Sequence, residues 1–98
     1  MILIVDSGAT KSDWIALDDK GDQLFLTQTL GLSPEVLTRE VIEDRLANNF
    51  ELSKNKEKVS HLYFYGAGCG TDRMKSFLKE IFSDFFPNAK THVKEDTY

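Results

Sequence analysis

A short polar turn after the first apolar run is the segment of this chain best suited to bind a phosphate. The run Ile2–Val5 is apolar and rich in β-branched residues, and residues 6–12 after it read Asp-Ser-Gly-Ala-Thr-Lys-Ser. Gly8 allows backbone N–H groups to approach an anion closely. Hydroxyl donors and a positive charge are added by Thr10, Ser12 and Lys11. These residue types at this spacing predict a loop that holds phosphate groups.

Asp6 ends the apolar run, where its carboxylate could hold Mg²⁺ through water molecules, because that ion retains part of its hydration shell. The alternative for the whole segment is an ordinary polar β-turn with an acidic residue at the strand end. The segment is not a P-loop, because Gly-x-x-x-x-Gly-Lys-Ser/Thr is absent. Residues 12–17, which follow the turn, also have the pattern of a strand instead of a helix.

The apolar pattern predicts the elements that position this turn. Strands are expected at residues 2–5, 12–17, 23–29, 59–65 and 90–94. A first helix is expected to begin with Ser33 as N-cap and Pro34 at its first position, and to continue to Phe50 before a solvated connection at 53–58. A second helix is expected to follow the glycines of segment 66–70. Its apolar stripe consists of Met74, Phe77, Leu78, Ile81, Phe82 and Phe85.

The element order β-β-β-α-β-α-β predicts an α/β fold. Three meandering strands, followed by strands that alternate with helices, require a mixed sheet with parallel crossovers. This is the layout of a ribonuclease-H-like or actin-like ATPase lobe. Such a lobe has one more helix after the fifth strand, so we expect residues 1–98 to be an N-terminal lobe that is truncated before its last helix.

Composition limits the classes of partner. The 98 residues include 12 Lys+Arg and 16 Asp+Glu, a net charge of −4, without the basic stripe that neutralises nucleic-acid phosphates. The one cysteine, Cys69, cannot form an intramolecular disulfide or a multi-thiolate metal site. The first apolar run is too short for a signal peptide or a membrane span. We therefore expect a cytoplasmic protein that binds neither nucleic acid nor membrane.

The turn at residues 6–12, between Ile2–Val5 and Trp14, resembles the first phosphate loop of the actin and hexokinase superfamily. More narrowly, it is similar to the N-acetylglucosamine kinase and BadF/BadG/BcrA/BcrD ATPase family, whose usual pattern is Asp-Gly-Gly-Gly/Ala-Thr-Lys-Thr/Ser. Ser7 stands where that family more often has glycine. Residues 65–69, Tyr-Gly-Ala-Gly-Cys, resemble the second glycine segment of the family.

The resemblance implies ATP and Mg²⁺ as cofactors. Asp6 would help to hold the Mg²⁺ of MgATP. The β- and γ-phosphates would be cradled by Gly8, Ala9, Thr10 and Lys11, with the Ser12 hydroxyl nearby.

The resemblance also implies a sugar site. The sugar-contact loop would fall at residues 31–34, where Ser33 replaces a frequent asparagine; a simple N-cap role is the alternative for Ser33. Gly66, Ala67 and Gly68 would face the sugar, although glycines there could instead serve tight strand-to-helix packing. Asp96, after the fifth strand, would be the general base, the alternative being an exposed acidic residue near the chain end.

These implications together predict the N-terminal lobe of an ATP-dependent sugar kinase that acts on N-acetylglucosamine or a related amino sugar. The chain alone would be inactive, because a C-terminal lobe completes the nucleotide site. Within the same family, an ATPase that activates a dehydratase through a shared iron–sulfur cluster is an alternative, and so is a non-catalytic nucleotide- or sugar-binding module. A two-metal nuclease is disfavoured because the segment directly after the fourth strand, Gly66-Ala67-Gly68, contains no acidic residue and the net charge is negative. The oligomeric state is left open, a homodimer included.

Overall fold

The structure is a computed structural model that describes residues 1–8, 10–33, 37–66 and 70–95. Several residues to which the sequence assigns a role lie outside these ranges: Ala9, Pro34, Ala67, Gly68, Cys69 and Asp96.

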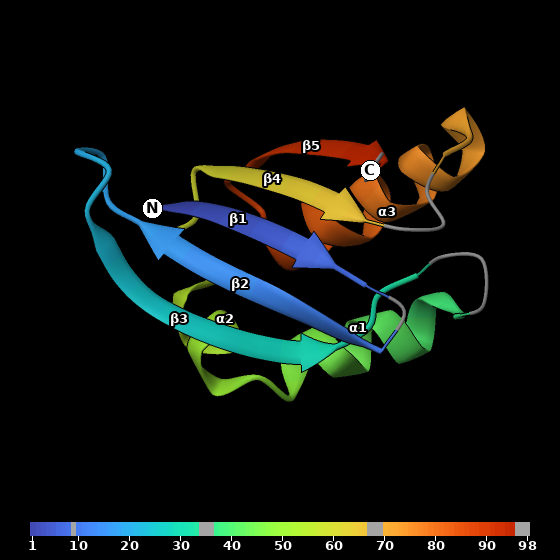
Figure 1. Ribbon diagram of the computed structural model, residues 1–98, viewed down its shortest axis with the longest axis horizontal. Helices are drawn as coiled ribbons and strands as arrows, with labels where there is room; N and C mark the ends of the chain where they lie inside the picture. Colours follow the sequence, from blue (N-terminus) through green and yellow to red (C-terminus); the bar gives the residue numbers. More distant parts are fainter. Residues whose placement is uncertain (9, 34–36, 67–69, 96–98) are drawn as a thin grey trace.

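The fold is built on one mixed five-stranded sheet, as the sequence predicts. Its strands are β1 (Ile2–Ser7), β2 (Lys11–Leu17), β3 (Gln23–Leu30), β4 (His61–Gly66) and β5 (Lys90–Glu95). The strand order is β3-β2-β1-β4-β5. β2 runs antiparallel to both neighbours, whereas β1, β4 and β5 are parallel (Figure 1).

The helices differ from the prediction between β3 and β4, where two helices replace the single one expected. They are α1 (Arg39–Ala47) and α2 (Phe50–Asn55). The break falls at Asn49, whose extended backbone leaves the helix and whose side chain accepts a hydrogen bond from Leu52 N. Asn48 is the C-cap of α1, and Asn49 starts α2 because its side chain satisfies an N–H that has no partner within the helix. Part of the connection expected at 53–58 is helical as a result.

The predicted start of the first helix is wrong. Ser33 is not the N-cap of α1: Thr38 is, with an extended backbone and a side-chain oxygen that accepts from Val41 N. Thr38 is followed by Arg39, which forms an ion pair one turn later with Glu43. The cap and this pair both favour a helix that begins at Arg39.

The third helix, α3 (Asp72–Phe85), matches the predicted apolar stripe. Thr71 caps its N-terminus by accepting from Met74 N. Leu78, Ile81 and Phe82 are buried at helical spacing. The packing of this stripe, and not helix propensity alone, stabilises α3.

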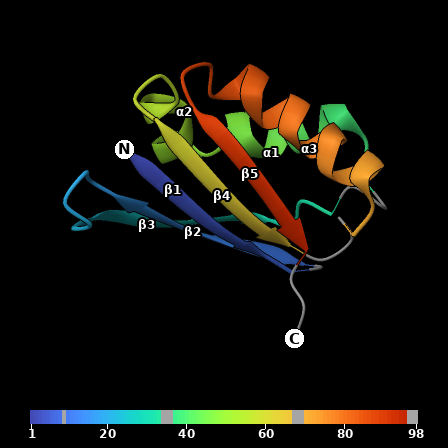
Figure 2. The same cartoon turned by 90° about the horizontal axis from the view of Figure 1, so that it is seen from above.

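The helices α1, α2 and α3 lie on one face of the sheet (Figure 2). The core forms between them and the inward residues of the strands, which include Leu3, Val5, Trp14 and Phe64. The Trp14 ring meets Phe82 edge to face at 6.4 Å, and its indole N–H donates to Thr29 Oγ1. Trp14 is therefore a core residue. Within the described ranges no helix is long and apolar enough to cross a membrane.

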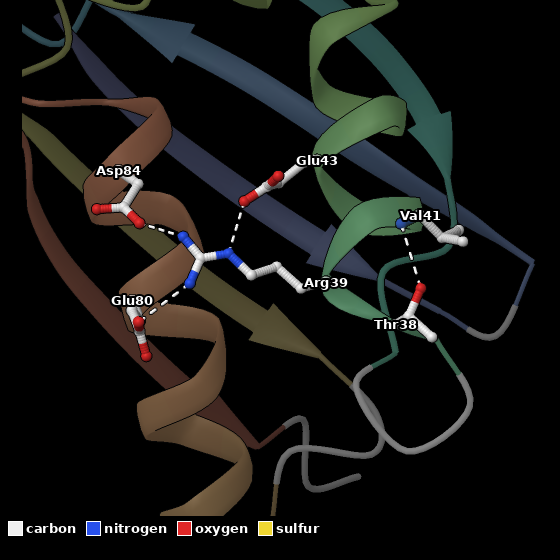
Figure 3. A network of polar contacts seen from close by, with 6 residues as sticks. All are labelled: Thr38, Arg39, Val41, Glu43, Glu80 and Asp84. Atoms are coloured by element: carbon white, nitrogen blue, oxygen red, sulfur yellow. Dashed lines mark hydrogen bonds and ion pairs between the residues drawn. The ribbon is translucent and has the colours of Figure 1, made fainter.

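Arg39 links α1 to α3 on the outer side of the helical layer. Its guanidinium donates to Glu43 on its own helix and to Glu80 and Asp84 on α3 (Figure 3). These hydrogen bonds, that to Glu43 foremost, raise the pKa of Arg39 above its usual value. The three carboxylates are well exposed, so this network fixes the spacing of two helices more than it stabilises the fold.

The opposite face of the sheet has no helix of the described ranges over it (Figure 2). The register places one row of residues across that face: Leu26, Ile15, Ile4, Tyr63 and His92. The rings of Tyr63 and His92 stack at 4.9 Å. Asp6, two residues beyond Ile4 on β1, shares this face because side chains alternate along a strand.

Gly66 is required by packing where β4 ends. A Cβ there would lie 2.4 Å from Phe64 Cε1 and 3.3 Å from Ser7 Cβ, and the Phe64 ring is buried. Gly66→Ala is therefore expected to lower the free energy of unfolding by about 1 to 3 kcal/mol through overpacking. Urea denaturation followed by circular dichroism measures the loss.

Gly8→Ala is the matched control, because a Cβ there would meet no described atom closer than Lys11 O at 3.6 Å. Its stability should stay within about 0.5 kcal/mol of wild type. Equal effects of the two substitutions would contradict the packing argument for Gly66.

Candidate functional site

The segments that the sequence singled out meet at one end of the sheet. β1, β3, β4 and β5 all point toward this end, and the β1–β2 turn closes it (Figure 1). In open α/β sheets, ligands bind beyond the carboxyl ends of the parallel strands. We call this end, made up of Asp6, Gly8, 10–12, 31–33 and Gly66, the loop edge.

The last two residues of β1 point to different faces. Asp6 is exposed on the helix-free face, whereas Ser7 is 1% exposed and points toward the helices. The turn thus offers a carboxylate to solvent on one side and a hydroxyl to the interior on the other.

Asp13 is a second carboxylate at this position, which the sequence reasoning missed. The register pairs Asp6 with Asp13 on β2 and with Tyr65 on β4. Asp13 Oδ1 also accepts a hydrogen bond of 2.6 Å from Gln28 Nε2 on β3. A tight turn that pairs Ser7 with Ser12 necessarily pairs the flanking residues Asp6 and Asp13, so the hairpin pattern was the available signal.

The β1–β2 turn has one internal backbone bond, from Gly8 N to Lys11 O at 2.9 Å. The Gly8 amide is therefore engaged within the turn and is not free for an anion. Thr10 and Lys11 are exposed, and among the described residues the Lys11 ammonium forms no ion pair. The side-chain donors that this turn presents to solvent in the described residues are thus the Thr10 hydroxyl and the Lys11 ammonium.

A buried hydroxyl pair lies beneath the turn. Ser12 Oγ donates to Ser7 Oγ at 2.7 Å, and both residues are almost fully buried. Ser7 Oγ also accepts from Leu32 N at 3.2 Å. The Ser12 hydroxyl is therefore used inside the protein, and its predicted contact with phosphate stays a prediction that this geometry does not favour.

The segment after β3 is held against the turn. Gly31 N donates to Thr10 O at 3.0 Å, and Arg45 of α1 donates to Gly31 O. Ser33, two residues after Gly31, is partly exposed, and its carbonyl oxygen accepts a hydrogen bond from Leu37 N. The structure thus brings Ser33 to the loop edge, and its hydroxyl does not cap α1.

Gly66 ends β4 beside Ser7 of β1, so it belongs to the same edge. Ala9, Ala67, Gly68 and Asp96 were also assigned to the site from the sequence, and they lie outside the described residues. In the described ranges no three His, Cys, Asp or Glu residues converge to hold a metal ion. Asp6 and Asp13 are the carboxylates nearest the turn by register.

These features define an α/β domain with a polar loop edge. No family model matches the chain, and no curated protein matches it either. Among solved structures, it is similar to one from Porphyromonas gingivalis that is named as a "Putative N-acetylglucosamine Kinase". The two are 33% identical with a TM-score of 0.85, over 98% of this chain and 34% of that one. The chain has the fold of part of that protein and spans about a third of its length.

The pairing of Asp6 with Asp13 leads to a stability prediction. Like charges directly opposite each other on neighbouring strands repel. Asp6→Asn is therefore expected to raise the free energy of unfolding by about 0.2 to 1 kcal/mol when divalent cations are removed with EDTA. Urea denaturation measures the difference.

Glu57→Gln changes the net charge equally at an exposed position in the connection after α2 and should leave stability unchanged. A loss of stability in Asp6→Asn would show that the carboxylate supports the fold instead of straining it.

Proposed function

We propose that this chain is the N-terminal lobe of an ATP-dependent sugar kinase that transfers the γ-phosphate of ATP to N-acetylglucosamine or a related amino sugar. The observation that carries the proposal is the meeting of the β1–β2 turn, the segment 31–33 and Gly66 at one edge of the sheet. The 33% identity to the Porphyromonas gingivalis protein over nearly the whole chain supports it.

The phosphate side of the proposed site is the β1–β2 turn. The Thr10 hydroxyl and the Lys11 ammonium are exposed there and can both donate to phosphate oxygens. Lys11 supplies the positive charge that a transferring phosphoryl group requires. Ala9 and Gly8 belong to the proposed cradle by sequence, and a Cβ at Gly8 would meet Lys11 O at 3.6 Å.

The residues present fit a bound Mg²⁺. This ion is usually held by one or two carboxylates together with substrate phosphates and water. Asp6 is exposed at the end of β1, with Asp13 beside it, so carboxylate oxygens lie next to the proposed phosphate position. When bound, the ion would neutralise charge on the phosphate oxygens. The repulsion between the two aspartates is then replaced by attraction to the ion.

The sugar side of the proposed site is formed by Ser33 and the glycine segment that begins at Gly66. Ser33 is partly exposed and is not the N-cap of α1, so we assign its hydroxyl to a ligand. Ser33 lies two residues beyond Gly31, which bonds to the turn, so a sugar bound at Ser33 would lie next to phosphates bound at the turn. A hydroxyl in place of an amide makes fewer hydrogen bonds, so the preferred sugar depends on this residue.

Asp96 is the proposed general base. It directly follows β5, which runs parallel to β1 and β4 and ends at the loop edge. An aspartate there would accept the proton of the sugar hydroxyl as its oxygen attacks the γ-phosphate, a contribution of about 10² to 10⁴ in rate.

Kinetics of the intact protein test this proposal. A coupled assay of ADP release should show turnover that depends on N-acetylglucosamine. Asp96→Asn is expected to lower kcat by about 10²-fold or more while it leaves the affinity for MgATP unchanged. Glu95→Gln, the neighbouring acidic residue, is the control and should keep wild-type kcat.

Other outcomes would replace the proposal. ATP hydrolysis that does not depend on any amino sugar would favour the dehydratase-activating ATPase. Binding of ATP and sugar without turnover would favour a non-catalytic module. Unchanged phosphoryl transfer in Asp96→Asn would remove Asp96 from the role of base.

A further inference from the structure

Ser7 occupies a position in the turn that the proposed function leaves without a role. It lies between Asp6 and Gly8, yet its side chain points away from both the solvent and the proposed phosphate position. Its hydroxyl instead lies in the buried layer, where Ser12 Oγ and Leu32 N both donate to it.

The bond from Leu32 N joins two segments that lie 25 residues apart in the chain. One is the β1–β2 turn on the phosphate side, and the other is segment 31–33 on the sugar side. We propose that Ser7 is a positioning residue that couples these two sides of the site, so that occupation of one side organises the other. This inference rests on the proposed function.

Burial makes the bond hard to replace. Leu32 is 0% exposed and Ser7 is 1% exposed, so water cannot readily take the place of the Ser7 oxygen. A buried N–H without a partner is costly. Segment 31–33 therefore cannot shift away from the turn without leaving the Leu32 amide unsatisfied.

The coupling depends on the residue type at position 7. A second bond between the same segments, from Gly31 N to Thr10 O, uses only backbone atoms and survives any substitution of Ser7. The Leu32 bond needs a side-chain oxygen, which glycine and alanine lack. Serine supplies that oxygen on a small side chain, beside a glycine at which an added Cβ would come within 3.3 Å of Ser7 Cβ.

The Ser12 hydroxyl donates its hydrogen bond to Ser7 and not to Leu30. Its hydroxyl has a single proton, and the contact to Ser7 Oγ at 2.7 Å is much shorter than the one to Leu30 O at 3.4 Å. Ser12 therefore orients the Ser7 oxygen, but the acceptor for Leu32 N belongs to Ser7. Loss of the Ser7 hydroxyl removes the acceptor for Leu32 N, whereas loss of the Ser12 hydroxyl does not. Ser7→Ala and Ser12→Ala are therefore a matched pair of variants.

The first experiment needs no ligand. Hydrogen exchange of the intact protein, resolved by NMR at single amides, compares wild type with Ser7→Ala and Ser12→Ala. Ser7→Ala should speed exchange of the Leu32 amide about tenfold or more, while amides in the middle of α3 keep their wild-type rates. Ser12→Ala should change the Leu32 rate much less. An unchanged exchange rate of the Leu32 amide in Ser7→Ala would contradict the proposal that the Ser7 oxygen holds segment 31–33 to the turn.

The second experiment measures the coupling itself. The affinity for N-acetylglucosamine is determined with and without a saturating magnesium complex of a non-hydrolysable ATP analogue. In wild type the analogue should tighten sugar binding about fivefold or more, within the range of ordinary coupling between sites. In Ser7→Ala the ratio of the two affinities should fall toward one, and in Ser12→Ala it should remain above one.

The outcomes separate this inference from the proposed function. Binding of both ligands in wild type with a ratio of one, or an unchanged ratio in Ser7→Ala, overturns the coupling and leaves the kinase proposal intact. Absence of binding of either ligand to wild type overturns the proposed function and the coupling together, and the exchange experiment still decides whether Ser7 tethers Leu32.

Discussion

The pairing of β1 with two neighbours of opposite direction is the constraint on which the rest of the structure depends. β1 is antiparallel to β2 through a tight turn and parallel to β4. That combination forces the turn to emerge at the same end of the sheet as the carboxyl ends of β4 and β5. The apolar residues of β1, buried toward the helices at Leu3 and Val5, hold it in this central place.

Side chains alternate along β1, so the two residues that end this strand lie on opposite faces of the sheet and have different surroundings. Asp6 faces solvent and can serve a ligand, whereas Ser7 faces the core and can serve the fold. The same division applies across the hairpin, where Asp13 is exposed and Ser12 is buried. A charged residue and a small polar residue in succession are thus both explained by the period of two in a strand.

The sheet could be predicted from the sequence because its signals are local. Apolar runs such as Ile2–Val5 indicate strands, and the alternation of later strands with helices requires parallel crossovers. The start of α1 could not be predicted as well, because Ser33 and Thr38 are both suitable caps by residue type. What decides between them is tertiary: segment 31–33 is held to the turn by Ser7 and Arg45, and the helix begins only beyond it.

The candidate site was predictable in its location and less so in its details. The family resemblance assigned the β1–β2 turn, Ser33 and Gly66 to one site. The strand register brings Gly66 beside the turn, and hydrogen bonds from Gly31 and Leu32 hold segment 31–33 there. The inward direction of the Ser12 hydroxyl and the engagement of the Gly8 amide depend on which face each residue takes and on a bond within the turn. Asp13 was missed because its place in the site follows from its pairing with Asp6 on the neighbouring strand, and its own sequence neighbours do not indicate that pairing.

The central claim is that the loop edge receives the terminal phosphates of a nucleotide, and a crystal structure of the intact protein with a magnesium-bound ATP analogue tests it most directly. The account predicts density for the terminal phosphate against Thr10 and Lys11, with the metal ion beside the Asp6 carboxylate. A nucleotide bound elsewhere, or a β1–β2 turn covered by other side chains so that no anion can reach it, would contradict the account.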